Sequence, residues 1–299
     1  MNIIGKISHV SEFNSERGQE TLHPLVSVLD QSKSDKIQAK RYLSDLFIIF
    51  LKDIKCEDFQ YGRNSYDYQE ESLIFIAPGQ IFGMESQEKR LIKPNGWALA
   101  FHPDFIKGSS LGKKIHEYHF FNYTSREALH ISKRERKTIV ACLLKIIDEL
   151  EQGIDKHSKT LIINNIELLL NYCVRYYDRQ FITREIQNKN ILVQFEELLH
   201  QYFASESQTK LGIPSVAYFA EKLNLSTNYF GDLIKKETGQ TALEFIQSKI
   251  LDLAKEKMFD PNKSISEIAY EVGYHYPHHF SRLFKDKIGI SPSDYRKTL

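Results

Sequence analysis

The stretches Phe219-Ala-Glu-Lys-Leu-Asn224 and Ile268-Ala-Tyr-Glu-Val-Gly273 decide the fold of the last hundred residues, because they are two copies of one pattern. The copies agree at positions 49 residues apart before the final turn residue and 50 residues apart after it. The later matches are Phe230 with Phe280, Leu233 with Leu283, Ile234 with Phe284, Lys235 with Lys285, and Gly239 with Gly289. Agreement of this length at a nearly constant spacing indicates an internal repeat.

Each copy predicts a helix, a tight turn and a second helix. The predicted helices are 215–223 and 227–237 in the first copy, and 264–272 and 277–288 in the second. Glycine follows the second helix of each copy, and Pro277 stands where the first residue of a helix tolerates proline. Ala220 and Ala269 lie where the paired helices are expected to cross closely. This is the helix-turn-helix pattern, in which the second helix enters the major groove of DNA.

The segment between the copies, Thr241 to Met258, is an unbroken helical pattern that Asp260-Pro261 ends. At about 1.5 Å per residue this helix is on the order of 27 Å long. Successive major grooves on one face of DNA lie about 34 Å apart. A rigid helix of this length is therefore expected to hold two recognition helices one turn of DNA apart.

The polar face of each recognition helix provides the candidate DNA contacts, since the apolar face is expected to pack on its own domain. The candidates are Thr227, Asn228, Gly231, Asp232, Lys235 and Lys236 in the first helix, and His278, His279, Ser281, Arg282 and Lys285 in the second. Arginine can donate two hydrogen bonds to guanine or bind phosphate, lysine suits phosphate, and asparagine can pair with adenine.

The two recognition helices differ in their capacity to read bases. Asp232 occupies the position that Arg282 holds in the other copy, and Gly231 offers no side chain. A carboxylate near phosphate is repelled unless it accepts from cytosine, so the second unit is expected to carry more of the specificity. Alternatively, Asp232 pairs with a neighbouring lysine and makes no DNA contact. The net charge of this region gives no evidence for DNA binding, because residues 201–299 hold 13 Lys and Arg against 12 Asp and Glu.

The first part of the chain predicts a β domain followed by helices. Apolar runs at 46–51, 72–77 and 96–101 are bounded by glycine and proline, which is typical of strands in a small sandwich or barrel. Helical spacing follows from about residue 132, first in Ile139, Val140, Leu143, Leu144, Ile147 and Leu150. A second helix carries Leu161, Ile162, Asn165, Leu168, Leu169, Tyr172 and Cys173. These helices are expected either to cover the sheet or to pair with a second subunit, and the charged stretch 179–190 is expected to be a linker.

The second copy contains Glu267-Ile-Ala-Tyr-Glu-Val-Gly-Tyr274, His279-Phe-Ser-Arg-Leu-Phe-Lys285, Gly289 and Ser291-Pro-Ser-Asp-Tyr-Arg296. With these residues it resembles the AraC/XylS family of transcription regulators. The resemblance covers about residues 193–299. It implies promoter DNA and RNA polymerase as partners, and often a cupin-like N-terminal β-barrel that senses a small molecule, followed by dimerisation helices. Tyr276 departs from the family, which usually has a short polar residue there that caps the helix.

The expected fold class is therefore α+β, with a small cupin-like β-barrel and following helices, then an all-α domain of two helix-turn-helix units joined by a long helix. The expected domains are 1–130 (sensor), 131–190 (helical dimerisation and linker region) and 191–299 (DNA-binding). The interpretation is a cytoplasmic, nucleoid-associated bacterial regulator, dimeric, that activates promoters in response to a small molecule. A regulator whose N-terminal domain only dimerises or binds a protein remains open as the alternative.

Enzymatic readings are disfavoured, and no cofactor is expected. A catalytic cupin needs clustered metal ligands, whereas the strand region holds only His23, with His102 just after it, and His116 and His119 lack a completing acid. Cys56, Cys142 and Cys173 are widely spaced, which argues against a disulfide framework or a zinc site. They also sit among apolar or helical patterns, which lack the setting of the reactive cysteine in a DNA-repair methyltransferase. The chain has no run of about 18 apolar residues and no apparent signal peptide, so no membrane partner is expected. Phe47, Phe50, Phe75 and Trp97 could line a ligand pocket, but such residues more often form the core.

Overall fold

The structure, a computed structural model, describes residues 4–38, 40–52, 60–61, 71–83, 91–124, 127–152, 155–183 and 185–299. The chain divides into two units, Met1–Thr183 and Arg184–Leu299, and each is described by itself. Within the expected linker at 179–190, the described residues 179–183 and 185–190 are helical rather than forming a loop. The functional division into sensor, dimerisation and DNA-binding parts stays a prediction.

The three strands predicted from the sequence are neighbours in one antiparallel sheet. They are β5 (Phe47–Lys52), β7 (Ser72–Ile76) and β10 (Trp97–Phe101), and β5 pairs with both of the others. β2 (Val26–Asp30) and β11 (Leu129–His130) complete the order β11-β7-β5-β10-β2 within the described residues. Every side chain of β7 is buried. Burial on both faces explains why these strands are unbroken apolar runs rather than alternating ones.

A second layer of strands packs on one face of this sheet. Its described strands are β1 (Gly5–Ile7), β4 (Arg41–Ser44), β8 (Ile81–Gly83) and β6 (Gln60–Tyr61), in that order, while β3 (Ile37–Gln38) pairs with β9 (Leu91–Ile92). Phe50 joins the layers, because its ring centroid lies 5.8 Å from Phe82 on β8 and 6.2 Å from Phe13 in α1 (Val10–Ser15). The prediction of a β domain is confirmed, and the cupin-like barrel stays a prediction.

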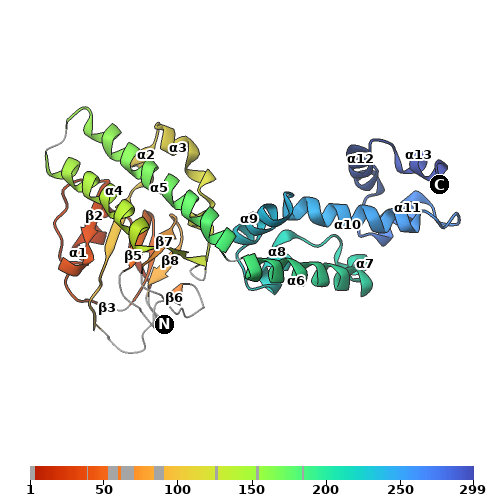
Figure 1. Ribbon diagram of the computed structural model, residues 1–299, viewed down its shortest axis with the longest axis horizontal. Coiled ribbons are helices and arrows are strands. Elements are labelled where there is room, and N and C mark those ends of the chain that lie inside the picture. The colour runs from red at the N-terminus through yellow and green to blue at the C-terminus, as the bar shows by residue number, and fades with distance from the viewer. Residues whose placement is uncertain are drawn as a thin grey trace. The chain divides into compact units, whose positions relative to one another are not determined.

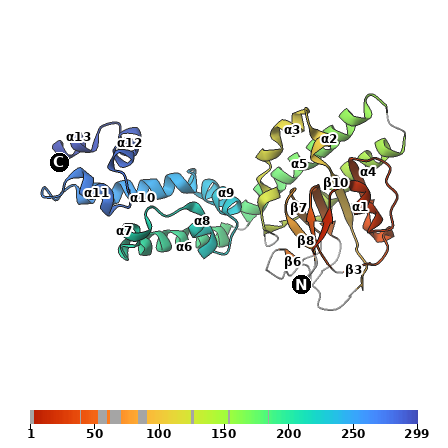
Figure 2. The ribbon, with the colours of Figure 1, turned by 180° about the vertical axis from the view of Figure 1, so that it is seen from behind.

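Helices cover the opposite face of the main sheet. α4 (Lys133–Glu151) and α5 (Ser158–Thr183) lie side by side (Figures 1 and 2). Tyr177 of α5 reaches the strands, where its ring lies 6.2 Å from Phe75 and its hydroxyl donates to the Glu127 carbonyl at 3.0 Å. Shorter helices connect β10 with β11, namely α2 (Pro103–Ile106), α3 (Ser110–Lys114), η2 (Ile115–Glu117) and η3 (His119–Asn122), and η1 (Gln31–Lys33) follows β2.

The four aromatic residues considered as pocket lining do not share a face. Phe47 and Phe75 point to the helical side, where both contact Phe121 at centroid distances of 5.0 and 5.6 Å. Phe50 points to the second layer of strands, and Trp97 is half-buried at the start of β10. Successive residues of a strand face opposite ways, so Phe47 and Phe50, three positions apart, cannot line one wall. The prediction that they form core is the better description of the contacts.

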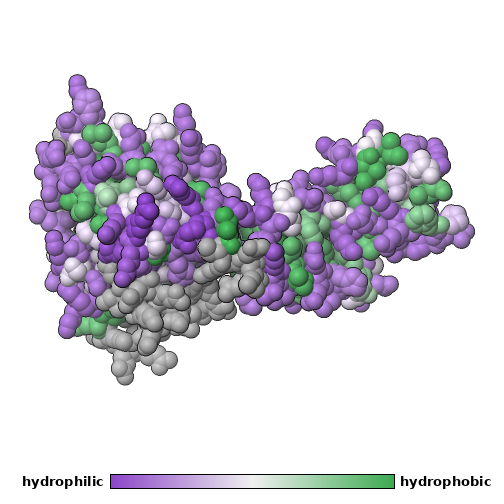
Figure 3. All heavy atoms as spheres, in the orientation of Figure 1, coloured by the Kyte–Doolittle hydropathy of each residue, from purple (hydrophilic) through white to green (hydrophobic). Residues whose placement is uncertain are grey.

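The apolar stripes predicted on the two helices are only partly buried. Ile139, Leu143, Ile162 and Leu169 are buried, which confirms that one side of each stripe covers the domain. A second group stays exposed by 41–45% of its surface, comprising Leu144, Leu161, Leu168 and Val174. Apolar patches are visible over these helices in Figure 3.

The second unit is helical. Its described helices are α6 (Glu185–Ala204), α7 (Ser207–Leu211), α8 (Val216–Lys222), α9 (Thr227–Thr238), α10 (Ala242–Lys257), α11 (Ile265–Glu271), α12 (Pro277–Ile288) and α13 (Pro292–Lys297). Phe195 of α6 is fully buried, and its ring centroid lies 5.0 Å from those of Phe219 and Phe230 and 5.3 Å from that of Phe245. This aromatic cluster holds α6, α8, α9 and α10 together. Among the described helices of both units, none combines the length and apolar character that a membrane span requires.

Candidate nucleic-acid interface

The first helix-turn-helix unit comprises α8 and α9. Asn224 makes the turn with φ +56°, a left-handed conformation that asparagine tolerates better than most residues. The Ser226 hydroxyl then accepts a hydrogen bond from the Tyr229 amide at 3.1 Å, which caps α9. Gly239, with φ +75°, ends the helix, and its amide donates to the Lys235 carbonyl at 2.9 Å. The predicted helix, turn, helix and glycine stop are confirmed.

The second unit, α11 and α12, repeats this backbone. The amides of Leu225 and Tyr274, which follow the two turns, donate to the carbonyls of Ala220 and Ala269, both at 2.9 Å. Gly273 stands at the turn with φ +99°, where the first unit has Asn224. Both alanines are at most 1% exposed, as expected where helices cross closely. The repeat seen in the sequence is thus a repeat of hydrogen bonds.

The two recognition helices begin differently. Tyr276 precedes α12, and its side chain makes no capping hydrogen bond. The His279 amide donates instead to the Tyr276 carbonyl at 3.0 Å, and Pro277, the first helical residue, has no amide to satisfy. The predicted loss of a side-chain cap is therefore confirmed.

The apolar faces of α9 and α12 pack inward, as predicted. Phe230, Leu233, Ile234, Phe280 and Phe284 are completely buried, and Leu283 is half-buried. Phe284 also packs on Tyr295 of α13 at a centroid distance of 5.4 Å, which ties α12 to the end of the chain. The opposite face of each helix is left for solvent or DNA.

Most of the predicted DNA contacts lie on those outer faces. The exposed ones are Thr227, Asn228, Lys235 and Lys236 on α9, and His278, His279, Arg282 and Lys285 on α12, while Gly231, Asp232 and Ser281 are half-buried. The Arg282 side chain is 84% exposed, and its ion pair with Asp286 spans 3.9 Å between two exposed groups. Such a pair is weak, so the guanidinium can turn to another anion. Asp232 and Lys236 do have partners on the protein.

Three exposed rings surround the start of α12, a feature that the sequence interpretation did not treat as a group. The ring centroids of His278 and His279 lie 4.2 Å apart, and Tyr276 lies within 5.9 Å of both. Tyr276 is 63% exposed. The signal was present as three aromatic side chains within four positions, but exposure of all three depends on how α12 packs.

Ion pairs anchor the second helix-turn-helix unit, α11 and α12, to α10. The Glu271 carboxylate accepts from Lys257 Nζ and Lys263 Nζ, both at 2.6 Å, and Lys287 of α12 reaches Glu244 at 3.2 Å. The hydrogen bonds from Lys257 and Lys263 hold the pKa of Glu271 below its ordinary value of 4.5. α10 itself has 16 residues, about 24 Å at roughly 1.5 Å per residue, slightly shorter than the predicted segment because its end residues serve as caps.

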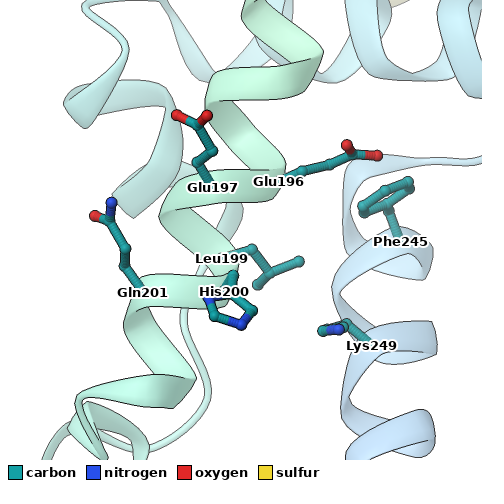
Figure 4. Close-up of a pocket in the computed structure, with 7 residues that line it drawn as sticks. All are labelled: Glu196, Glu197, Leu199, His200, Gln201, Phe245 and Lys249. Carbon is teal, nitrogen blue, oxygen red and sulfur yellow. The ribbon is translucent and has the colours of Figure 1, made fainter.

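A groove of about 550 Å³ lies between α6 and α10 (Figure 4). Leu199 and His200 of α6 face Phe245 and Lys249 of α10 across it. No predicted DNA-contacting residue lines this groove. It is therefore separate from the proposed recognition surface.

Two of the three cysteines, Cys142 and Cys173, lie in the described residues, and both are free and buried. Burial raises the pKa of the Cys142 thiol and, more strongly, that of the Cys173 thiol, which disfavours the reactive thiolate form. Within the described part of the chain, no group of three or more His, Cys, Asp or Glu side chains is placed to hold a metal ion. Cys56 lies outside the described residues.

Comparison with known proteins identifies the repeat. A helix-turn-helix domain family matches residues 219–298. The raffinose operon transcriptional regulatory protein of Pediococcus pentosaceus is 36% identical over 77 residues, which span 26% of this chain and 28% of that protein. Residues 219–298 form an AraC-type helix-turn-helix domain. This confirms the family resemblance.

A longer alignment extends beyond the AraC-type domain. The lactose operon transcription activator of Staphylococcus xylosus is 24% identical over 244 residues, covering 79% of this chain and 80% of that one. Three other relatives are matched over only 14%, 63% and 31% of their length. Among solved structures, the C-terminal domain of the response regulator AraT from Geobacillus stearothermophilus is 32% identical, with a TM-score of 0.33 over 36% of this chain and 85% of that chain. The matched relatives are transcription regulators rather than enzymes.

Proposed function

We propose that the chain is a sequence-specific, DNA-binding transcription regulator of the bacterial cytoplasm and nucleoid, with α9 and α12 as its recognition helices. The observation that carries this proposal is the repeated helix-turn-helix backbone, which buries the apolar side of each second helix and exposes the polar side. Exposed lysine and arginine on α9 and α12 suit the phosphate backbone, which dominates the affinity of such proteins.

The proposal assigns different work to the two helices. Arg282 is the base-reading residue of α12, since its guanidinium is exposed and held only by a weak pair. Lys235, Lys236 and Lys285 bind phosphate. Asn228 reads a base or the backbone at the start of α9, while Asp232 is engaged on the protein.

DNA binding to fragments upstream of the gene and its neighbours tests this assignment across a salt series. Arg282→Ala should reduce the preference for the best fragment over random DNA by about 1–3 kcal/mol. Lys285→Ala should weaken all fragments alike and lower the salt slope by about 1. Lys107→Ala, at an exposed position of the N-terminal unit (residues 1–183), removes the same charge and should change neither the preference nor the salt slope. Equal binding of every fragment by the wild-type chain would contradict the proposal.

We further propose a homodimer that pairs through α4 and α5. Leu144 on α4, with Leu161 and Leu168 on α5, remains exposed after the other side of each stripe has packed on the sheet. An apolar stripe at this spacing suits a helical partner. Sedimentation at micromolar concentration should show a dimer that Leu168→Asp weakens and Leu22→Asp, at an equally exposed leucine, does not. A strict monomer with and without DNA would overturn this part.

The N-terminal unit, residues 1–183, has two candidate roles. A small-molecule effector and promoter activation through RNA polymerase are what the family resemblance implies. The packing of Phe47, Phe50 and Phe75 into two separate parts of the core favours the alternative, in which this unit only dimerises or binds a protein. Calorimetric titration of the purified chain with the metabolites that the products of neighbouring genes act on distinguishes the two roles, because only the sensor role predicts saturable binding.

A further inference from the structure

We propose that α7 is a brace that sets the position of the second recognition helix relative to the first. The inference rests on the proposed DNA-binding function for its consequence, but the contacts that carry it are independent of DNA. α7 precedes the first helix-turn-helix unit in the chain, yet it packs on α11 of the second unit. α7 also packs on α6, which in turn contacts α8 and α9, so α7 and α6 together link the two helix-turn-helix units a second time, in addition to α10.

A buried glutamine makes the polar part of this connection. Gln208 of α7 is 6% exposed, and its Nε2 donates to the Glu271 carbonyl at 3.1 Å. This carbonyl stands at the end of α11, where helix carbonyls lack partners within the helix. Glu271 is also the residue whose side chain holds Lys257 and Lys263. One residue at the end of α11 is thus bound from α7 and from α10.

Two glycines make the close-packed part. A Cβ on Gly273 would lie 3.2 Å from the Gln208 Cβ and 3.2 Å from the Gly212 carbonyl carbon, which is tighter than ordinary contact. Gly273 is the turn residue of the second unit, so the backbone after α7 touches that turn directly. The Tyr202 hydroxyl donates to the Gly212 carbonyl at 2.9 Å and fixes this backbone on α6.

The space beside α7 shows why the contact matters. A groove of about 600 Å³ is lined by His200 and Gln208 on one side and by Lys257 and Glu271 on the other. Packing between α6 and α10 is therefore incomplete along this line, and beside it α7 contacts α11. α10 alone fixes the distance between the two helix-turn-helix units. The contact through α7 is a second attachment, which also limits rotation of the second helix-turn-helix unit about α10.

The consequence is a constraint on the DNA site. For two recognition helices on one duplex, the separation of the subsites is a geometric property of the protein. With the brace intact, only one separation should be tolerated. When the brace is broken, α12 should reach subsites that are displaced by a base pair.

Distance measurement by electron spin resonance tests the brace without DNA. Labels are placed at Asn228→Cys and His279→Cys in a Cys56→Ser background, while Cys142 and Cys173 are buried. Gln208→Met keeps the volume but removes the donor, and Gln208→Ala removes both. Both variants should widen the distance distribution about twofold. Lys210→Ala, at an exposed position on the same helix, should leave it unchanged. Unchanged distributions in both glutamine variants would overturn the proposal, and Gln208→Met preserves the test if Gln208→Ala does not fold.

Binding to selected duplexes supplies the functional readout. For the wild-type chain, moving the subsites by one base pair should lower affinity about tenfold. In Gln208→Met the same change should cost less than about threefold. A lower melting temperature with the spacing penalty intact would show a merely structural role and contradict the brace. Absence of any preferred duplex for the wild type would contradict the proposed function, while the distance measurement would still decide on the brace.

Discussion

The two helix-turn-helix units share a backbone and differ in the surface that the backbone presents. Their turns use the same hydrogen bonds at the same length, from Leu225 to Ala220 and from Tyr274 to Ala269. On the recognition helices, however, Gly231 and Asp232 stand where the other unit has Ser281 and Arg282. The scaffold therefore tolerates different outer residues, because the turn hydrogen bonds and most of the buried positions that maintain it recur in both units.

The largest expected effects probe the shared scaffold. Phe230→Ala and Phe280→Ala should each reduce the free energy of unfolding by about 3–5 kcal/mol, because each ring is completely buried. Urea denaturation followed by circular dichroism measures both. Tyr270→Ala, at a residue 53% exposed, should change it by less than about 0.5 kcal/mol. A large cost in only one of the two phenylalanine variants would break the equivalence of the two cores.

Intermediate effects are expected at the starts of the recognition helices. Ser226→Ala removes a side-chain cap and should cost about 0.5–2 kcal/mol of stability. Tyr276→Ala removes no cap, so it should cost less than about 0.5 kcal/mol. Tyr276→Ser would restore the residue type found in the first unit and should stabilise α12 by about 1 kcal/mol. Equal losses in the first two variants, by urea denaturation, would show that Tyr276 stabilises its helix in another way.

The smallest expected effect is a difference between the two helix-turn-helix units in their response to acid. Glu271 of the second unit corresponds to Lys222 of the first, whose Nζ lies over the Tyr218 ring at 5.8 Å. Because its lysine partners lower the pKa of Glu271, its contribution to stability is present above pH 4.5 and is lost as the pH falls through the lowered value. Hydrogen exchange should therefore increase at the end of α11 before the end of α8 on acidification. Glu271→Gln should abolish this difference, and an unchanged order in that variant would contradict it.

Local patterns accounted for most of the helical unit. Ser215, Ser226 and Ser264 cap helices that begin within one residue of the predicted starts, and Gly239 and Gly289 end the recognition helices in left-handed conformations. Such signals act within a few residues, so they can be read without knowing the fold. Three strands of the first unit, β5, β7 and β10, were also located from their apolar runs. Their order was not, because pairing of β5 with both β7 and β10 depends on contacts between distant parts of the chain.

By itself, the sequence determined the tandem repeat, its turns and the buried side of each recognition helix, since spacing along the chain directly encodes which residues share a helix face. Only the tertiary structure decided which part of each apolar stripe on α4 and α5 stays exposed. It also decided that Phe50 and Phe75 belong to different layers, and that Gln208 reaches Glu271 across 63 positions of sequence. These features arise where elements far apart in the chain meet, and no local periodicity specifies which elements will meet.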